Sequence, residues 1–167
     1  MLLCFAAAGV ACAGNGIETA GDVLFLALPA VAGGAAIAHA DSDGAVMFGK
    51  SSAVTLGATY ALKQTVDERR PNGGVHSFPS GHASVSFASA EFLRGRYGRD
   101  YGIPAYAAAL FVAYSRVESR NHYAHDVIAG AAIGIASSRF FTRPYAGWHV
   151  QAEADGDYLG VRLGRDW

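Results

Sequence analysis

The segment Ser115–Asp126 places the strongest constraint on how this chain can fold. Its twelve residues include two Arg, one Glu, two His and one Asp, and it lies between two alanine-rich apolar runs, Ile103–Tyr114 and Val127–Ala136. Burying such groups without partners is costly, because a charge loses its hydration on leaving water. The two runs must therefore pack so that this polar segment meets either partners or a ligand.

Two residues of this segment, His122 and Asp126, are spaced for a joint role. They are four positions apart, so a helical turn would place both on one face within hydrogen-bond reach. A carboxylate that holds one imidazole nitrogen leaves the other free to act as a nucleophile. The spacing therefore predicts an activated imidazole at His122.

The composition limits the class of protein. The chain has 167 residues, enough for one domain, and its formal net charge of −1 provides no basic field for nucleic acid. Hydrophobic residues make up 51% and charged residues 16%, which is richer in apolar residues than an ordinary soluble protein. The mean hydropathy of +0.19 is nevertheless low for a chain that mostly spans a bilayer. The 21 glycines and many alanines favour close packing of helices through small residues.

The first residues form a separate segment. Residues 1–13 are apolar and end in Ala-Cys-Ala, similar to a signal-peptide cleavage site, but they lack the usual basic start. The alternatives are a secretory signal peptide and the beginning of a helix. Both cysteines, Cys4 and Cys12, lie here, so cleavage would leave a mature chain without disulfides or cysteine ligands.

Residues 14–145 are predicted to form one all-α domain. The segment Asp67–Pro79 is turn-rich and predicts a loop, and the basic Arg94–Asp100 predicts a connector. A membrane span needs about 20 apolar residues, and several of the apolar runs are shorter or interrupted. The pattern favours a compact helical bundle, soluble or peripheral, with an integral bundle of short or tilted helices as the alternative. The predicted helices are Asp22–Ala40, Ala45–Leu62, Gly81–Leu93, Ile103–Tyr114 and Asp126–Phe141.

Residues 146–167 differ from the helical domain. Apolar and polar residues alternate from Trp148 to Ala154, a turn follows at residues 155–157, and Tyr158–Leu163 can return as a second strand. The tail is therefore predicted to form a β-hairpin.

Two further polar segments complement Ser115–Asp126. Lys63 and Arg70 flank a loop, and Pro79-Ser80-Gly81-His82 opens an apolar helix with Ser80 as its N-cap. A helix N-terminus attracts anions through its unpaired N–H groups and its dipole, and Gly81 lets the backbone approach closely.

The three polar segments together offer the groups that bind a phosphoryl group. Arg70 and Arg116 offer bidentate contacts to phosphate oxygens, and Lys63 adds a point charge. His122 would attack phosphorus with Asp126 orienting it, while His82 would protonate the leaving oxygen and then activate water. Since cationic side chains supply the charge, we expect neither a metal nor a cofactor, and we expect vanadate to inhibit as a phosphate mimic.

In order and spacing, the motifs Lys63-x6-Arg70-Pro71, Pro79-Ser80-Gly81-His82 and Ser115-Arg116-x5-His122-x3-Asp126 resemble those of the type 2 phosphatidic acid phosphatase superfamily. That superfamily includes bacterial nonspecific acid phosphatases, membrane lipid phosphatases and vanadium haloperoxidases. The resemblance implies an all-α bundle with a nucleophilic His122, its partner Asp126, and a phosphohistidine intermediate. It also implies a phosphate pocket made of Lys63, Arg70, Ser80, Gly81, His82 and Arg116.

The expected function is metal-independent hydrolysis of phosphate monoesters or pyrophosphates, with a lipid-linked substrate favoured. The alternatives are a vanadium-dependent haloperoxidase and a soluble acid phosphatase acting on small phosphomonoesters. The motifs bind only the phosphate, so they select neither the rest of the substrate nor an oligomeric state. We expect a periplasmic or extracytoplasmic protein, soluble or peripheral, with an integral inner-membrane protein as the alternative.

Several neighbouring residues are expected to lie outside the chemistry. His125 is one position away from the motif and is interpreted as a bystander or a support. Glu118 and Arg120 are predicted to form an ion pair with each other or with Arg116. Asp67 and Glu68 are predicted to be a solvated loop face.

Overall fold

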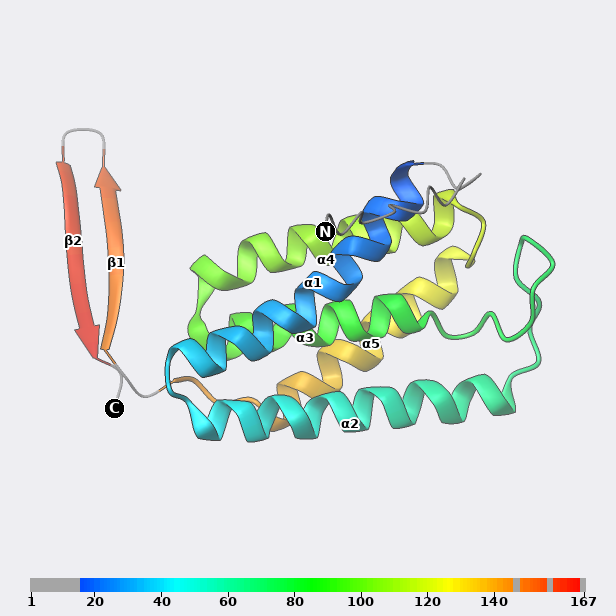
Figure 1. Cartoon of the computed structure of the whole chain (residues 1–167), viewed down its shortest axis with the longest axis horizontal. Coiled ribbons are helices and arrows are strands. Elements are labelled where there is room, and N and C mark those ends of the chain that lie inside the picture. Colours follow the sequence, from blue (N-terminus) through cyan, green and yellow to red (C-terminus); the bar gives the residue numbers. More distant parts are fainter. Residues whose placement is uncertain (1–15, 146–147, 156–157, 166–167) are drawn as a thin grey trace, which may run out of the picture.

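The computed structural model describes residues 16–145, 148–155 and 158–165 of the chain. Over these residues it forms five helices and one two-stranded sheet (Figure 1), which confirms the predicted all-α bundle with a terminal hairpin. The segment predicted as a signal peptide, residues 1–13, lies outside the described residues. The elements are α1 (Gly16–Ala38), α2 (Ser42–Thr65), α3 (Gly81–Tyr97), α4 (Arg99–Glu118), α5 (Ala124–Phe141), β1 (Trp148–Asp155) and β2 (Tyr158–Arg165).

Helix α3 forms the centre of the bundle and packs against the other four helices (Figure 1). Its large side chains Phe87, Phe92 and Leu93 are buried in one core with Leu28 of α1 and Val112 of α4. The remaining buried positions of α3 are mostly serine and alanine, whose small side chains let neighbouring helices approach closely.

Two glycines of α5 set the closest of these approaches. A Cβ atom on Gly134 would lie 2.1 Å from the backbone oxygen of Ser84, and one on Gly130 would lie 2.4 Å from that of Ser80. Any larger residue would push α5 away from α3. The contact brings the beginnings of the two helices together, and the Ser80 N–H donates to the carbonyl of Asp126 at 2.9 Å.

The predicted basic connector Arg94–Asp100 is wrong in extent. Helix α3 continues to Tyr97 and α4 begins at Arg99, so the chain turns at Gly98, whose φ of +89° suits glycine. The arginines in this stretch do not end the helix because acidic partners neutralise them. Arg94 pairs with Glu91, and Arg96 pairs with Asp41.

The hairpin follows the predicted alternation. Trp148 pairs with Arg165 and Asp155 with Tyr158 in an antiparallel register, so β2 extends beyond the predicted end at Leu163. Figure 1 shows the hairpin beyond the end of the bundle where α1 turns into α2.

Helix α1 has the length and apolar composition needed to cross a membrane. Within the part of the chain that the structure describes, it is the one helix that meets both criteria. Core helices of soluble proteins and signal sequences meet them as well. Several large apolar side chains of α1 are exposed, among them Leu26 and Ile37.

Candidate active site

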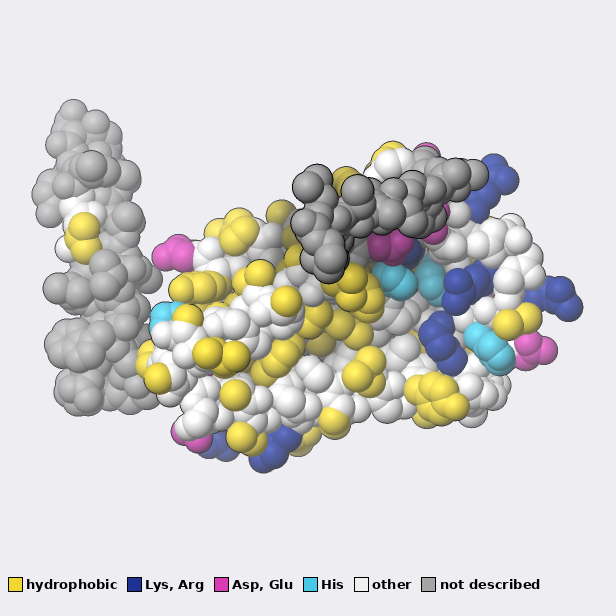
Figure 2. Space-filling model, in the orientation of Figure 1, with side chains coloured by type: hydrophobic (Ala, Val, Ile, Leu, Met, Phe, Trp, Pro, Cys, Tyr) yellow, Lys and Arg dark blue, Asp and Glu magenta, His cyan; other side chains and the backbone are white. Residues whose placement is uncertain are grey.

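A cavity of about 500 Å³ opens at the end of the bundle opposite the hairpin. Lys, Arg and His side chains gather at that end, with acidic side chains beside them (Figure 2). The cavity is lined by Glu18, Asp22, Phe25, Leu26, Lys63, Arg70, Gly81, His82, Arg116, Asn121 and His122.

Six of the eight predicted site residues line this one cavity, although they come from distant parts of the chain. Lys63 lies in the last turn of α2, Gly81 and His82 open α3, and Arg116 lies in the last turn of α4. Arg70 belongs to the loop between α2 and α3, and His122 to the segment before α5. The other two predicted residues, Ser80 and Asp126, are fully buried and are not among the lining residues.

Ser80 caps α3, as its position in the sequence predicts. Its side-chain oxygen accepts from the N–H of Ala83 at 3.4 Å. It thereby anchors the helix start that turns Gly81 and His82 toward the cavity. A direct contact between Ser80 and phosphate stays a prediction.

His122 and Asp126 lie close together, but they do not share a helical turn as expected. His122 precedes α5, while Asp126 is in its first turn and accepts from the backbone N–H of Tyr123 at 2.9 Å. Because a helix start exposes N–H groups that a carboxylate can accept, this cap holds Asp126 next to His122. His122 Nδ1 lies 3.4 Å from Asp126 Oδ2, within ion-pair range but without the angles of a hydrogen bond.

Asp126 is held by Ser77, which the sequence did not indicate, and by His125, which the sequence left as either a bystander or a support. The Ser77 hydroxyl donates to Asp126 Oδ2 at 2.5 Å. On the other side, His125 Nε2 lies 3.2 Å from Asp126 Oδ1 and 2.8 Å from Glu68. His125 is therefore a support for Asp126. Of the predicted solvated loop face, Asp67 is exposed, whereas Glu68 is only partly exposed because its carboxylate contacts His125.

Glu68, His125 and Asp126 form the one group of potential metal ligands found among the described residues. The ligand atoms of Glu68, His125 and Asp126 lie within 4.8 Å of one another. His125 Nε2 contacts both of these carboxylates.

The charges around His122 favour its neutral form. Burial, together with the nearby cations Arg70 and Lys63, lowers the pKa of His122 to about 4, although Asp126 opposes this shift. Burial also lowers the pKa of Lys63, and Arg70 adds to this effect. At neutral pH, His122 therefore keeps a free lone pair, while Arg70 and Arg116 supply positive charge beside it.

Arg116 is fixed in place by several contacts. Its guanidinium donates to the Ser115 hydroxyl at 3.1 Å and to the carbonyl of Glu18 at 2.9 Å, and it pairs with Asp22 at 2.8 Å. Among the described residues, Glu118 and Arg120 form none of the predicted ion pairs, because α4 ends at Glu118 and Asp22 takes the place next to Arg116.

Helix α1 supplies one wall of the cavity, which sequence reasoning missed. Its Phe25 ring packs on the His82 ring with the centroids 4.2 Å apart, and Glu18 accepts from the Asn121 amide at 2.7 Å. A carboxylate such as Asp22 at the beginning of an apolar run is the one signal that could have identified this wall.

The arrangement places a neutral imidazole beside three cations in one cavity, and such a set of groups suits an oxyanion. Comparison with known proteins agrees. The PAP2 superfamily matches residues 62–149, slightly more than half of the chain. A lipid A 4′-phosphatase from Helicobacter pylori is 30% identical over 158 residues, covering 86% of this chain and 79% of that protein. The chain belongs to the PAP2 superfamily.

A second curated relative is matched over a shorter stretch. A lipid A 1-phosphatase from Porphyromonas gingivalis is 37% identical over 83 residues, which is 47% of this chain but only 19% of that protein. The family assignment made from the three motifs is confirmed, and with it the class of enzyme, a phosphomonoester hydrolase.

Two solved structures share the fold. LpxE from Aquifex aeolicus has a TM-score of 0.57 at 20% identity, with 71% of this chain and 83% of that chain covered. A transmembrane PAP2-type phosphatidylglycerolphosphate phosphatase from Bacillus subtilis has a TM-score of 0.56 at 24% identity, with 75% and 71% covered.

Proposed function

We propose that this chain is a metal-independent phosphatase that removes phosphate from a membrane lipid of the lipid A type through a phosphohistidine. The carrying observation is the cavity itself, where Lys63, Arg70, Arg116 and His122 lie together beside α1, a helix with exposed apolar side chains. The two curated relatives, both lipid A phosphatases by name, support the choice of substrate.

The first chemical step would form a P–N bond. Because Nδ1 of His122 faces Asp126, its Nε2 is the nitrogen left to attack phosphorus. The bond from phosphorus to the lipid oxygen breaks, and protonated His82 gives its proton to that oxygen. Lys63, Arg70 and Arg116 stabilise the charge on the three remaining phosphate oxygens, and Asp126 stabilises the positive charge on the His122 ring.

The second step would restore the enzyme. His82, now neutral, takes a proton from a water molecule, whose oxygen attacks phosphorus on the side that the lipid has left. The P–N bond breaks, inorganic phosphate forms, and His122 is neutral again. Burial lowers the pKa of His82, and the cation Arg116 adds to this, so the protonated His82 gives up its proton more readily than a free imidazole does.

The apolar surroundings of the cavity support a lipid substrate. A groove of about 660 Å³ lies along α1, lined by Gly16, Thr19, Ala20, Val23, Leu24 and Phe111 of α4. The phosphate cavity uses Asp22, Phe25 and Leu26 of the same helix. An acyl chain bound along α1 would therefore bring its headgroup to the cations. We propose that α1 associates with the membrane and that the site faces the periplasm.

The test is phosphate release from a substrate panel by the purified full chain in detergent. Lipid A bisphosphate, phosphatidic acid, phosphatidylglycerophosphate and p-nitrophenyl phosphate would be compared with EDTA present. We expect lipid A to be cleaved fastest, vanadate to inhibit, and alkaline quenching to trap a labelled phosphohistidine. Cleavage of the soluble ester alone, or vanadate-dependent halide oxidation by peroxide, would refute the proposal.

A further inference from the structure

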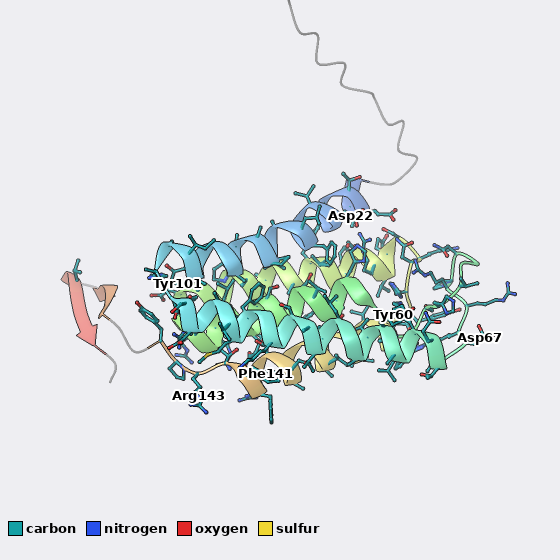
Figure 3. The ribbon with its side chains drawn as sticks, turned by 60° about the horizontal axis from the view of Figure 1, so that its bottom comes forward. Asp22, Tyr60, Asp67, Tyr101, Phe141 and Arg143 are labelled. Atoms are coloured by element: carbon teal, nitrogen blue, oxygen red, sulfur yellow. The ribbon has the colours of Figure 1, made fainter. Side chains whose placement is uncertain are left out.

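One carboxylate on α1 binds two of the groups assigned to the phosphate. Asp22 Oδ1 lies 2.8 Å from Arg116 Nη1 and 3.2 Å from His82 Nε2. The Arg116 side chain is 4% exposed, whereas that of Asp22 is 49% exposed and lines the cavity. Asp22 lies in the part of α1 nearest the site (Figure 3).

A single oxygen shared by a guanidinium and an imidazole is the contact expected of a phosphate oxygen. In the proposed reaction, Arg116 binds the phosphate and His82 protonates the leaving oxygen. Both groups are here engaged by Asp22. A carboxylate and a phosphate dianion repel each other, so the two anions cannot share these donors without a large cost.

We propose that Asp22 competes with the substrate phosphate for Arg116 and His82, and so determines how tightly the cavity binds phosphate. This inference rests on the proposed function of the cavity. A substrate must break the Asp22 contacts to bind. A lipid offsets that cost by burying its chains against apolar surface, whereas inorganic phosphate has no such contact to make. Asp22 would thereby weaken the hold on the product after hydrolysis.

The positions of both donors are independent of Asp22. Arg116 is also held by the Ser115 hydroxyl and the Glu18 carbonyl, and the His82 ring packs on Phe25. Replacing Asp22 by asparagine should therefore remove the charge without displacing Arg116 or His82.

A second consequence concerns the protonation of His82. Asp22 is the group near His82 whose charge raises its pKa, against burial and the cations Arg116 and Arg70, which lower it. Without the carboxylate, the pKa of His82 falls further, so the acid form would be lost at a lower pH. The titratable and charged groups that face the same cavity are Glu18, Asp22, Lys63, Arg70, Arg116 and His122.

The experiment measures binding of inorganic phosphate to the full chain by calorimetry, alongside lipid hydrolysis as a function of pH. Asp22→Asn should bind phosphate about 5- to 10-fold more tightly, as removal of one repulsive charge at short range implies, and the alkaline limb of its kcat/KM profile should move to lower pH. Asp22→Ser repeats the charge removal with a side chain that cannot rebuild both contacts. Asp100→Asn, an equal charge change in the first turn of α4 far from the cavity, should bind like wild type.

The outcomes separate this inference from the proposed function. Unchanged or weaker phosphate binding by both Asp22 variants, in a chain whose wild type cleaves the lipid, would overturn the role of Asp22 alone. A folded wild type that neither cleaves phosphoesters nor binds phosphate would overturn the function, and the inference with it.

Discussion

The two ends of the bundle contain polar clusters of opposite character. At the end where α1 turns into α2, the carboxylate of Asp41 accepts from Arg96 at 2.5 and 2.6 Å, from Tyr97 at 2.9 Å and from the Gly44 N–H at 2.9 Å. The remaining Arg96 nitrogen donates to the carbonyls of Arg143 and Pro144. The charged groups of this cluster therefore find their hydrogen-bond partners within the protein.

The cluster at the cavity end is incomplete. Among the described residues, the buried atoms Arg70 Nε, His122 Nδ1 and Asp126 Oδ1 make no hydrogen bond. Figure 3 shows the separation, with Asp22 and Asp67 toward one end and Tyr101 and Arg143 toward the other. Buried polar groups left without such bonds cost stability, and they persist where function requires them. The comparison indicates that one cluster stabilises the fold while the other acts on a ligand.

The largest expected effect is the loss of activity when a residue of the cavity cluster is removed. His122→Ala removes the proposed nucleophile, so lipid phosphatase activity should fall by about 10⁴-fold or more, as for other nucleophile deletions. The melting temperature is measured in parallel, because the removed ring is buried and its loss also removes packing. The matched control is His125→Gln, which alters only a support of Asp126 and should lose about 10- to 100-fold in activity, far less than His122→Ala. Wild-type turnover by His122→Ala would refute the assignment.

The next largest effect is the loss of stability when the Asp41–Arg96 cluster is disrupted. Arg96→Met leaves the buried carboxylate of Asp41 without its cation, which typically costs about 3–5 kcal/mol. Urea denaturation should show this loss in the free energy of unfolding, while the folded fraction keeps its kcat. If the variant lost kcat without losing stability, the two clusters would not be independent.

The pH dependence of activity tests the cavity end more finely. The nucleophile must be neutral, and the pKa of His122 is about 4, so kcat/KM should fall as pH drops through about 4. His82 must be protonated, and its pKa is lowered from 6.5, so activity should also fall as pH rises, with a midpoint below 6.5. A profile still rising above pH 7 would contradict these roles.

The pH dependence of stability tests the other end, with the smallest expected effect. Arg96, by its hydrogen bonds, lowers the pKa of Asp41 from 3.8 to about 2. The unfolded state therefore takes up the proton first. The ionised carboxylate of Asp41 therefore contributes about 2 kcal/mol to the free energy of unfolding. This contribution is complete above about pH 4 and is lost as pH falls from about 4 to 2. Acid unfolding curves of wild type and Arg96→Met should converge in that window.

Local patterns in the sequence determined much of this protein. Periodic apolar runs predicted five helices, the alternation after Trp148 predicted the hairpin, and motif spacing selected the residues that now line one cavity. These predictions succeed because helix periodicity, caps and turns depend on neighbours within a few positions of the sequence. Helix ends were less certain: the charges of Arg94–Asp100 suggested a connector, yet α3 continues to Tyr97 because acidic partners neutralise the arginines.

Only the tertiary structure decided which distant groups meet. The Ser77 hydroxyl reaches Asp126 across 49 positions, and Asp22 reaches Arg116 from another helix. The close approach of α5 to α3 at Gly130 and Gly134 places Asp126 beside the start of α3, and the packing of α1 supplies the acidic wall. Such contacts depend on how whole helices pack, and no spacing within one segment encodes that.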